Sequence, residues 1–281
     1  MTIQVEATHG YRRRVPGWDG PRRAAGLLRG TAARWALTLV GPLAILGLWQ
    51  GAIELGLMSA QVLPPPSLVW ATLVDLALTG DLSANLALSA RRIIFGLAIG
   101  APLGLAFGLA LALSRTLEDY LGPTFRALAA VPSLGWIPVL ILVLGIEESL
   151  KIVILAKACF VPMAIAAIEG GRAVPHELSE AAAVMRLGTL TRLRRLTLPA
   201  AMPFLFRGLR LSVGQAFVSL VVVEMLAGTD GIGYLMVWGR TLFQLDLVIA
   251  GMIVVGVTGF ILDLLLRRVE RRVARRYGAD V

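Results

Sequence analysis

The chain has 281 residues, and because 57% are hydrophobic and 16% charged, with a mean hydropathy of +0.77, it offers too little polar surface for an ordinary soluble enzyme. A single cysteine, Cys159, excludes an internal disulfide and a multi-cysteine metal site, and two histidines, His9 and His176, leave little for zinc or imidazole catalysis, so no catalytic, cofactor-binding or metal residue is expected. The net charge of +9 forms no stripe interleaved with aromatic residues, which argues against a nucleic-acid partner.

Six stretches approach the roughly 20 apolar residues that a helix needs to cross a bilayer. They predict transmembrane helices over 35–57, 93–113, 127–145, 152–168, 211–226 and 247–266. An even number of crossings returns the chain to the side on which it began. The basic clusters, which fall within 1–34, 115–126, 172–210 and 267–281, then all lie in the cytoplasm, as the positive-inside rule requires. We therefore expect an all-α integral membrane protein with both termini cytoplasmic.

The same pattern divides the chain into segments. They are a basic cytoplasmic tail over 1–34, the first transmembrane helix over 35–57, a periplasmic segment over 58–90, a membrane core over 91–266 with a cytoplasmic segment at 172–200, and a basic tail over 267–281. The first apolar run is longer than a signal-peptide core, so the first helix is expected to be retained.

The periplasmic segment opens with Leu63-Pro64-Pro65-Pro66-Ser67, which predicts an extended turn, and a short surface helix is expected over 67–78. Arg91 and Arg92, at the outer end of the second span, break the positive-inside rule, so they are expected to snorkel or to pair with acidic residues. Within that span, glycines recur every four residues and predict close approach of another helix. They are Gly96, Gly100, Gly104 and Gly108.

The third span is interrupted by prolines. A broken helix at membrane depth is tolerated only where protein or a water-filled cavity satisfies the freed backbone groups. Pro132, Ser133 and Pro138 are therefore expected to border a translocation path, or else to form a kink packed by neighbouring helices.

Charged and polar residues inside the fourth and fifth spans are further candidates. An ionised group at mid-bilayer costs about 2.5 to 3.5 kcal/mol, so Lys157 and Glu224 should not face lipid. Lys157 could attract an anionic substrate, snorkel, or pair with a carboxylate such as Glu224. Ser212, Gln215 and Ser219 share one helical face and predict a polar stripe, which either lines a pore or joins neighbouring helices.

The cytoplasmic segment predicts two short helices. Pro175 and Glu177 suit a first helical turn, and apolar residues recur at helical spacing from Leu178 to Met185. Gly188 is expected to permit a sharp turn into a second helix, which Pro199 would stop. Such a surface could enter a groove on another protein or bind anionic lipid headgroups.

Glu180-Ala181-Ala182, followed at fixed spacing by Leu196 and Leu198-Pro199, resembles the EAA signature of ABC importer permeases, E-A-A-x3-G-x9-I-x-L-P. Arg186 stands at the signature glycine, with Gly188 two residues later, so the helix is expected to run past Arg186. Other segments, among them Leu63-Pro64-Pro65-Pro66-Ser67 and the run from Glu224 to Tyr234, resemble the nitrate, sulfonate, taurine and bicarbonate branch of these permeases.

The resemblance implies a type I ABC importer permease (MetI-like) fold with six transmembrane helices and a cytoplasmic coupling helix. It implies a homodimer in a bacterial inner membrane, joined by two ABC ATPase subunits and a periplasmic substrate-binding protein. ATP and Mg would bind the ATPase subunits, since neither lysine of this chain lies in a phosphate-binding loop. The residues expected to couple to the ATPase are Glu180, Ala181, Ala182, Met185, Arg186, Gly188, Leu198 and Pro199.

The loop after the fifth span resembles an outer gate, with Glu224, Gly228, Gly231 and Gly233 as its residues. Glu224 is expected to orient this loop with Arg91, Arg92 or Arg240 as its partner, and the glycines to supply backbone freedom. The solute is expected to be a small anion; nitrate, bicarbonate, sulfonates, taurine and small aromatic carboxylates or heterocycles stay open.

Two other classes of function have weaker support in the sequence. A stand-alone channel or ion-coupled secondary transporter would need a carboxylate relay or an inverted repeat, and the sequence offers one glutamate, Glu224, as a candidate for a relay and no convincing halves. An intramembrane enzyme would need a nucleophile and a base within the spans, yet both histidines lie outside them.

Overall fold

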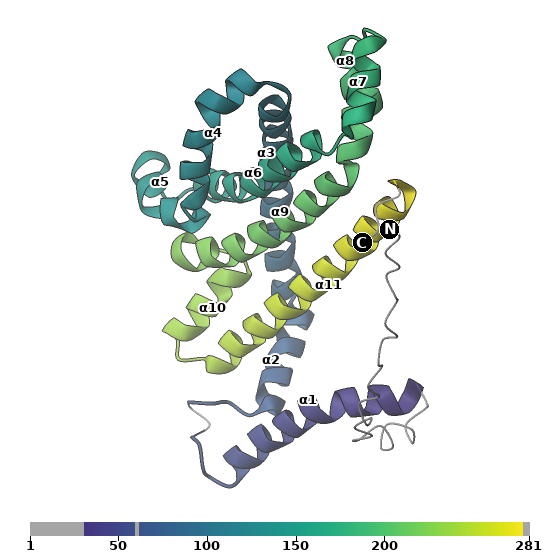
Figure 1. Cartoon of the computed structure of the whole chain (residues 1–281). Coiled ribbons are helices and arrows are strands. Elements are labelled where there is room, and N and C mark those ends of the chain that lie inside the picture. Colours follow the sequence, from purple (N-terminus) through teal and green to yellow (C-terminus); the bar gives the residue numbers. More distant parts are fainter. Residues whose placement is uncertain (1–30, 60–61, 278–281) are drawn as a thin grey trace, which may run out of the picture.

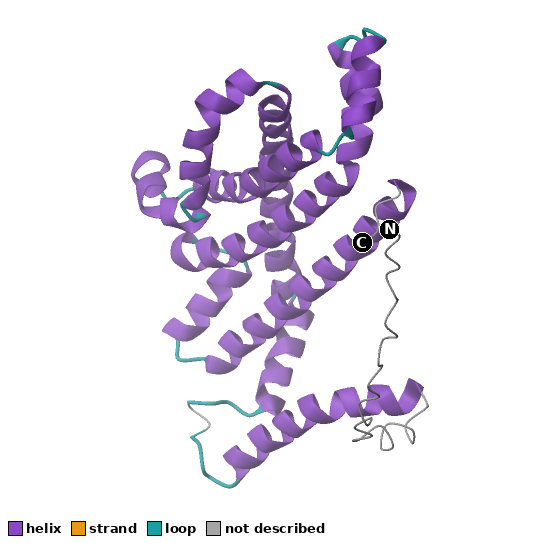
Figure 2. Cartoon of the chain, viewed as in Figure 1, coloured by secondary structure: helices purple, strands orange, loops and turns teal. Residues whose placement is uncertain are grey.

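The computed structural model describes residues 31–59 and 62–277, which form helices and no strand (Figure 2). Most of the predicted tail over 1–34 therefore lies outside the described residues. The elements are α1 (Thr31–Glu54), α2 (Pro66–Thr79), α3 (Asp81–Leu113), α4 (Arg115–Ala130), the 3-10 helix η2 (Ser133–Trp136), α5 (Ile137–Leu144), α6 (Glu148–Arg172), α7 (His176–Val184), α8 (Thr189–Arg192), the π-helix η3 (Leu193–Thr197), α9 (Leu198–Ala227), α10 (Ile232–Thr241) and α11 (Leu245–Tyr277).

Four stretches of the described chain are long and apolar enough to cross a membrane: α3, α6, the continuous helix Leu190–Ala227, and Leu245–Arg272 of α11. The bent pair formed by α4 and Ser133–Leu144 makes a fifth if it is one span. The first predicted span, 35–57, overlaps α1, which is 24 residues long and ends at Glu54. The structure is thus all-helical and rich in membrane-spanning helices, as predicted.

The third predicted span, 127–145, contains the expected break at its prolines. The chain forms α4 and Ser133–Leu144, which are bent by 90° at that break, and α4 begins at Arg115, well before the predicted start of the span. Pro132 lacks an N–H group and disfavours helical geometry in the residue before it, and Val131 is extended, with φ −79 and ψ 118. The proline pair therefore breaks the helix rather than kinking it.

Helices α3 and α6 pack at backbone distance because of the glycine stripe. A Cβ atom on Gly100 would lie 2.1 Å from the Ala156 carbonyl oxygen, and one on Gly108 would lie 2.3 Å from that of Ala164. Gly104 makes the same kind of approach to Phe160. The prediction that these glycines admit another helix is confirmed, and that helix is α6.

Helix α9 completes the core by packing on α6. Here too small residues meet, since a Cβ atom on Gly208 would lie 2.3 Å from the Ala166 Cβ. A buried cluster joins all three helices and contains Ala101, Met163, Ala167, Ala201 and Leu205. This three-helix core holds the outer ends of α3, α6 and α9 at fixed positions.

Helix α2 confirms the surface helix predicted over 67–78, and it packs on the start of α11. Val69 and Leu247 share a buried cluster, and the Thr72 hydroxyl donates to Asp246 at 2.6 Å. Gly80, with φ +86, lets α3 begin immediately afterwards, well before the predicted start at residue 93. Arg92 consequently lies inside a helix instead of at its end.

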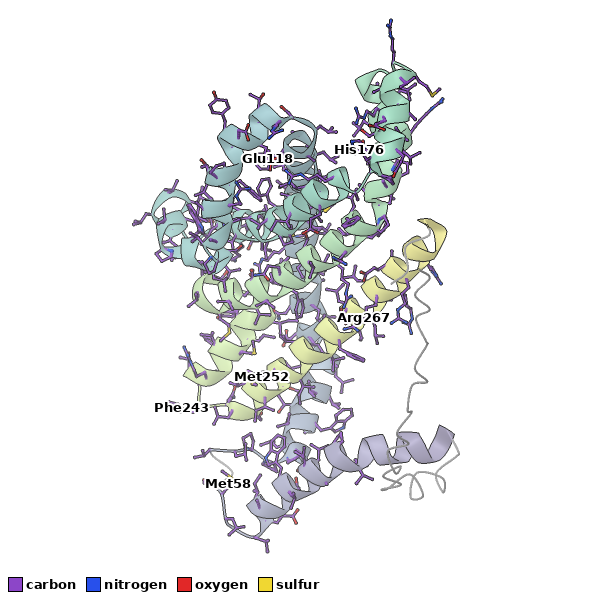
Figure 3. All side chains as sticks on the ribbon, in the orientation of Figure 1. Met58, Glu118, His176, Phe243, Met252 and Arg267 are labelled. Atoms are coloured by element: carbon purple, nitrogen blue, oxygen red, sulfur yellow. The ribbon has the colours of Figure 1, made fainter. Side chains whose placement is uncertain are left out.

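The molecule is elongated, with functional candidates toward both ends. Helices α7 and α8 project at one end, and α1 and the connection between α10 and α11 lie toward the other (Figure 1). His176 on α7 and Phe243 after α10 are correspondingly far apart (Figure 3). The two candidate regions therefore face different ends of the same helical core.

Candidate functional site

A buried ion pair lies near the end of the core that is remote from α7, where α3 faces α9; this is the end predicted to face outward. The Arg92 and Glu224 side chains are each 1% exposed, and Arg92 Nη1 donates to Glu224 Oε1 at 2.8 Å. Of the three partners predicted for Glu224, Arg92 is confirmed. Arg92 does not snorkel; it pairs with acidic residues, because a guanidinium buried inside the core requires compensating carboxylates.

Three more charged groups complete what we call the outer charge cluster: Glu148, Lys151 and Asp230. Arg92 Nε donates to Glu148 at 3.0 Å and Nη1 to the Asp230 carbonyl at 3.1 Å, and its Nη2 also pairs with both carboxylates. Lys151 Nζ donates to Glu148 at 2.8 Å and lies 3.7 Å from Asp230. These three residues were not predicted to take part; their positions in or just after the loops that follow α5 and α9 were the available signal.

Glu224 also holds the loop that follows α9. Its Oε2 accepts a hydrogen bond from the Gly233 N–H at 3.0 Å, while its Oε1 accepts from the Ser89 hydroxyl at 2.7 Å. Asn85 accepts from the Gly231 N–H at 2.7 Å. The carboxylate thus fastens the loop to α3 and α9 together, as expected of a residue that orients this loop.

The three loop glycines have different reasons to be glycine. Gly231 has φ +100, and a Cβ atom there would lie 2.4 Å from Glu224 Oε1, so it needs both freedom and space. Gly233 needs space only, because its Cβ would lie 2.6 Å from the Val221 carbonyl oxygen. Gly228 has φ −88, and its Cβ would lie 2.2 Å from the Glu224 carbonyl oxygen, so it too needs space. The prediction of backbone freedom is therefore wrong for Gly228 and Gly233.

The second candidate region begins at α7, which ends at Val184. Arg186 adopts φ +53, and the prediction that the helix runs past it is wrong. The Arg186 N–H donates to Ala183 O and the Leu187 N–H to Ala182 O, each at 3.0 Å, which is the bonding pattern of a Schellman turn. Arg186 therefore takes the left-handed conformation for which glycine is the usual residue.

The turn is made at Arg186, and Gly188, which is absent from the positive-φ glycines of the described chain, does not make it. Pro199 does not stop the second helix either, because α8, η3 and α9 form one helix over Leu190–Ala227. The π-turn shifts the hydrogen bonds, with Leu198 N–H donating to Leu193 O, and Pro199 follows as an early residue of α9. The α7 surface is thus joined directly to the fifth span.

The surface of α7 and its turn exposes apolar side chains beside a charge. Val184 is 84% exposed and Met185 71% exposed, and the Glu180 side chain is 68% exposed. Ala181 is also exposed, whereas Ala182 is buried at 3%. The Arg192 side chain pairs with the Ser179 hydroxyl and holds α7 against α8. This combination suits contact with another surface.

Lys157 lies at the break between α4 and η2. Its Nζ donates to the Val131 carbonyl oxygen at 3.0 Å and lies 5.5 Å from the centroid of the Trp136 ring. The alternative in which it pairs with Glu224 is wrong, because Lys157 donates to the Val131 carbonyl oxygen where α4 ends, and Glu224 pairs with Arg92. Ser133 is buried, whereas Pro132 and Pro138 are exposed.

The predicted polar stripe on α9 is divided. Ser212 is fully buried and donates to the Cys159 carbonyl oxygen at 2.8 Å, so it joins α9 to α6. Ser219 is fully buried too, while Gln215 is exposed. The face that packs on the core runs through Ser212, Ala216 and Ser219, which leaves Gln215 beside that face. In this conformation only Gln215 offers a polar group to an open surface.

Similarity to known proteins extends over most of the chain. Residues 100–275 match the family described as binding-protein-dependent transport system inner membrane component. The chain is 36% identical to the putative aliphatic sulfonates transport permease protein SsuC of Bacillus subtilis (strain 168), over 86% of this chain and 87% of that protein. It is 31% identical to the taurine transport system permease protein TauC of Escherichia coli (strain K12), over 87% and 93%.

Two further similarities are more distant. The nitrate import permease protein NrtB of Synechocystis sp. is 29% identical over 62% of this chain and 64% of that protein. A chain in an inward-facing structure of the MetNI methionine ABC transporter superposes with a TM-score of 0.56 at 19% identity, covering 70% of this chain and 95% of that chain. The second similarity concerns the fold.

Proposed function

The chain belongs to the family of binding-protein-dependent transport system inner membrane components, and we propose that the two candidate regions of this permease have separate roles in the import of a small anion. It is a multi-pass permease subunit of an ABC importer. The observation that carries the proposal is the exposed α7 surface, whose turn at Arg186 leads directly into the long apolar helix Leu190–Ala227.

In this proposal the α7 surface docks on a separate ATPase. Glu180, Ala181, Ala182 and Met185 provide the contact, and Arg186 and Gly188 shape the turn that follows. Leu198 and Pro199 lie where the π-turn passes into α9, so movement of α7 is transmitted along one rigid helix. ATP and Mg bind the ATPase, and this chain hydrolyses nothing.

The assembly is proposed to contain two copies of the chain, two ATPase subunits and a periplasmic binding protein, with α7 and both termini in the cytoplasm. ATP binding closes the ATPase pair and favours the outward-open arrangement, and hydrolysis returns the inward-open one. For this the closed ATPase must bind one arrangement more tightly than the other, because a partner with equal affinity for both shifts nothing.

The proposed path passes the break at Pro132, Ser133 and Pro138 and the exposed Gln215. Lys157 supplies a positive charge beside that break. Glu224 and the glycines of the following loop form the outer gate, held by Arg92 in the present conformation. Ser212 and Ser219 support the packing of α9 and do not contribute to the path.

The test is Glu180→Lys in the permease reconstituted with its ATPase and receptor in proteoliposomes. Reversing the charge on the docking surface should weaken co-purification of the ATPase and reduce uptake by about tenfold or more, while insertion into the membrane is unchanged. Asp119→Lys is the matched control, because Asp119 is an exposed acid on a different helix, α4.

Unchanged co-purification and uptake in Glu180→Lys would remove α7 from the ATPase contact. Uptake by the purified chain without ATPase or ATP would instead support the stand-alone channel or ion-coupled transporter. The two outcomes are separate, because the first concerns the docking surface and the second the source of energy.

A further inference from the structure

A cavity of about 460 Å³ lies among α3, α4, η2, α5 and α6, on the side of the molecule where Figure 1 labels α4 and α5. Cavities of roughly 300 to 1,000 Å³ are the usual size for small-molecule sites. Its walls are almost wholly aromatic and aliphatic, and no acidic residue lines it. The lining residues that matter here are Phe107, Phe125, Ala129, Trp136, Lys157 and Phe160.

One wall of the cavity is a fixed aromatic cluster. The rings of Phe107 and Phe125 are 5.2 Å apart between centroids, and each also contacts Phe160, at 5.6 and 6.2 Å. Such tilted and edge-to-face arrangements hold the rings in place. The wall is therefore a preformed surface for an apolar group.

Lys157 adds a positive charge to this otherwise apolar cavity. Its ammonium group has three N–H donors, and the described residues provide one acceptor, the Val131 carbonyl oxygen, and no carboxylate partner. The neighbouring Trp136 has a buried Nε1–H with no acceptor in the described part of the chain. The cavity thus combines a positive charge and unused donors with an apolar wall.

We propose that this cavity binds an organic anion, with the anionic group at Lys157 and the apolar part against the phenylalanine cluster. The inference rests on the proposed function and narrows its solute class to alkyl or aryl sulfonates and carboxylates. Nitrate has no apolar part to use the wall. Taurine carries an ammonium group, which Lys157 would repel and no lining carboxylate would receive.

The test measures binding of isotope-labelled 1-hexanesulfonate to the permease–ATPase complex in phosphatidylcholine nanodiscs. Saturable binding is expected, and each methylene added from ethanesulfonate to hexanesulfonate should tighten it by up to about fourfold. Lys157→Met should weaken binding by about tenfold or more, and Lys157→Arg should retain most of it.

Two variants test the wall. Ala129→Phe fills the cavity and should reduce hexanesulfonate binding, whereas Leu142→Phe, at an 87% exposed position on α5 that does not line the cavity, should not. Equal binding of nitrate, no dependence on chain length, or full binding by Lys157→Met or Ala129→Phe would each overturn the inference.

An anionic lipid has the same chemistry as the proposed ligand, namely a charged headgroup and a hydrocarbon chain. Hexanesulfonate binding that survives in phosphatidylglycerol nanodiscs supports a solute site, and binding abolished there shows that the cavity holds lipid and overturns the assignment. Binding is measured without transport, so failure of the ATPase-docking proposal would leave these results unaffected.

Discussion

Arg186 shows how a single residue can take a conformation that its own preferences oppose. Arginine is a good helix former, and a left-handed residue with a Cβ atom costs about 1 to 2 kcal/mol. The turn nevertheless forms, because the N–H groups of Arg186 and Leu187 satisfy carbonyls at the end of α7. Helix α7 therefore ends in a turn at the position where the EAA signature has glycine, although this chain has Arg186 there.

We predict that Arg186→Gly stabilises the permease by about 1 kcal/mol, because glycine adopts φ +53 without the steric cost. The measurement is thermal unfolding of the purified protein in detergent. Gly188→Ala is the companion variant: a Cβ atom there meets nothing within 4 Å and the residue has no positive φ, so little change is expected. A lower melting temperature for Arg186→Gly would show that the arginine side chain stabilises the turn.

The charged residues show which contacts could be predicted from sequence. Arg92 and Glu224 could be paired, because a charge at membrane depth requires an opposite charge and few were available. Lys157 could not be assigned, since its partner is a backbone carbonyl freed by Pro132, and no charge pattern reveals a carbonyl. Lys151 joined the outer charge cluster through its position one turn from Glu148.

At the level of helices, the close packing of α3 on α6 could be predicted from the glycines of α3. Four-residue spacing was enough to predict a close helix neighbour, because only a missing Cβ atom allows backbones to touch. The angle between α4 and Ser133–Leu144 could not be predicted. A hydropathy profile shows the length and apolar character of a segment, but it does not show the angle between two helices. The continuation of the helix through Pro199 could not be predicted either. The π-turn before Pro199 changes the hydrogen-bond pattern, so the helix continues although proline has no N–H group.

We predict that Gly100→Ala is strongly destabilising. The added Cβ atom would lie 2.1 Å from the Ala156 carbonyl oxygen, which is backbone and cannot rotate away, so α3 and α6 must separate. A loss of about 1 to 3 kcal/mol is expected. Gly214→Ala on α9 is the control, because its Cβ atom meets nothing within 4 Å. Equal melting temperatures for the two variants would contradict close packing at Gly100.

At the scale of the molecule, α9 connects the two candidate regions. It begins beside the π-turn below α8 and carries Glu224 near its other end. Helix α11 is fixed to it through Arg210, which bonds Asp263 at 2.9 Å and Glu270 at 3.0 Å. In the proposed mechanism, displacement of α7 would reach the loop after α9 through this joined pair of helices. The outer charge cluster would then set how readily that loop is released.

The cluster predicts a measurable coupling defect in Asp230→Asn. Asp230 lies in the outer loop and pairs with Arg92, but its side chain is 46% exposed, so the lost ion pair is worth at most about 1 kcal/mol. Glu224 still neutralises Arg92, and folding should be preserved. Weakening one fastening of the loop shifts the population away from the present conformation by up to about fivefold.

The expected result is a rise of up to about fivefold in ATP hydrolysis by the reconstituted complex without its receptor, since the outward-open arrangement becomes easier to reach. Asp75→Asn on α2 is the control, because it removes an exposed carboxylate outside the cluster. If hydrolysis without receptor is the same in Asp230→Asn and the unmodified protein, the cluster supports folding only. The loop would then open by a movement that leaves these ion pairs intact.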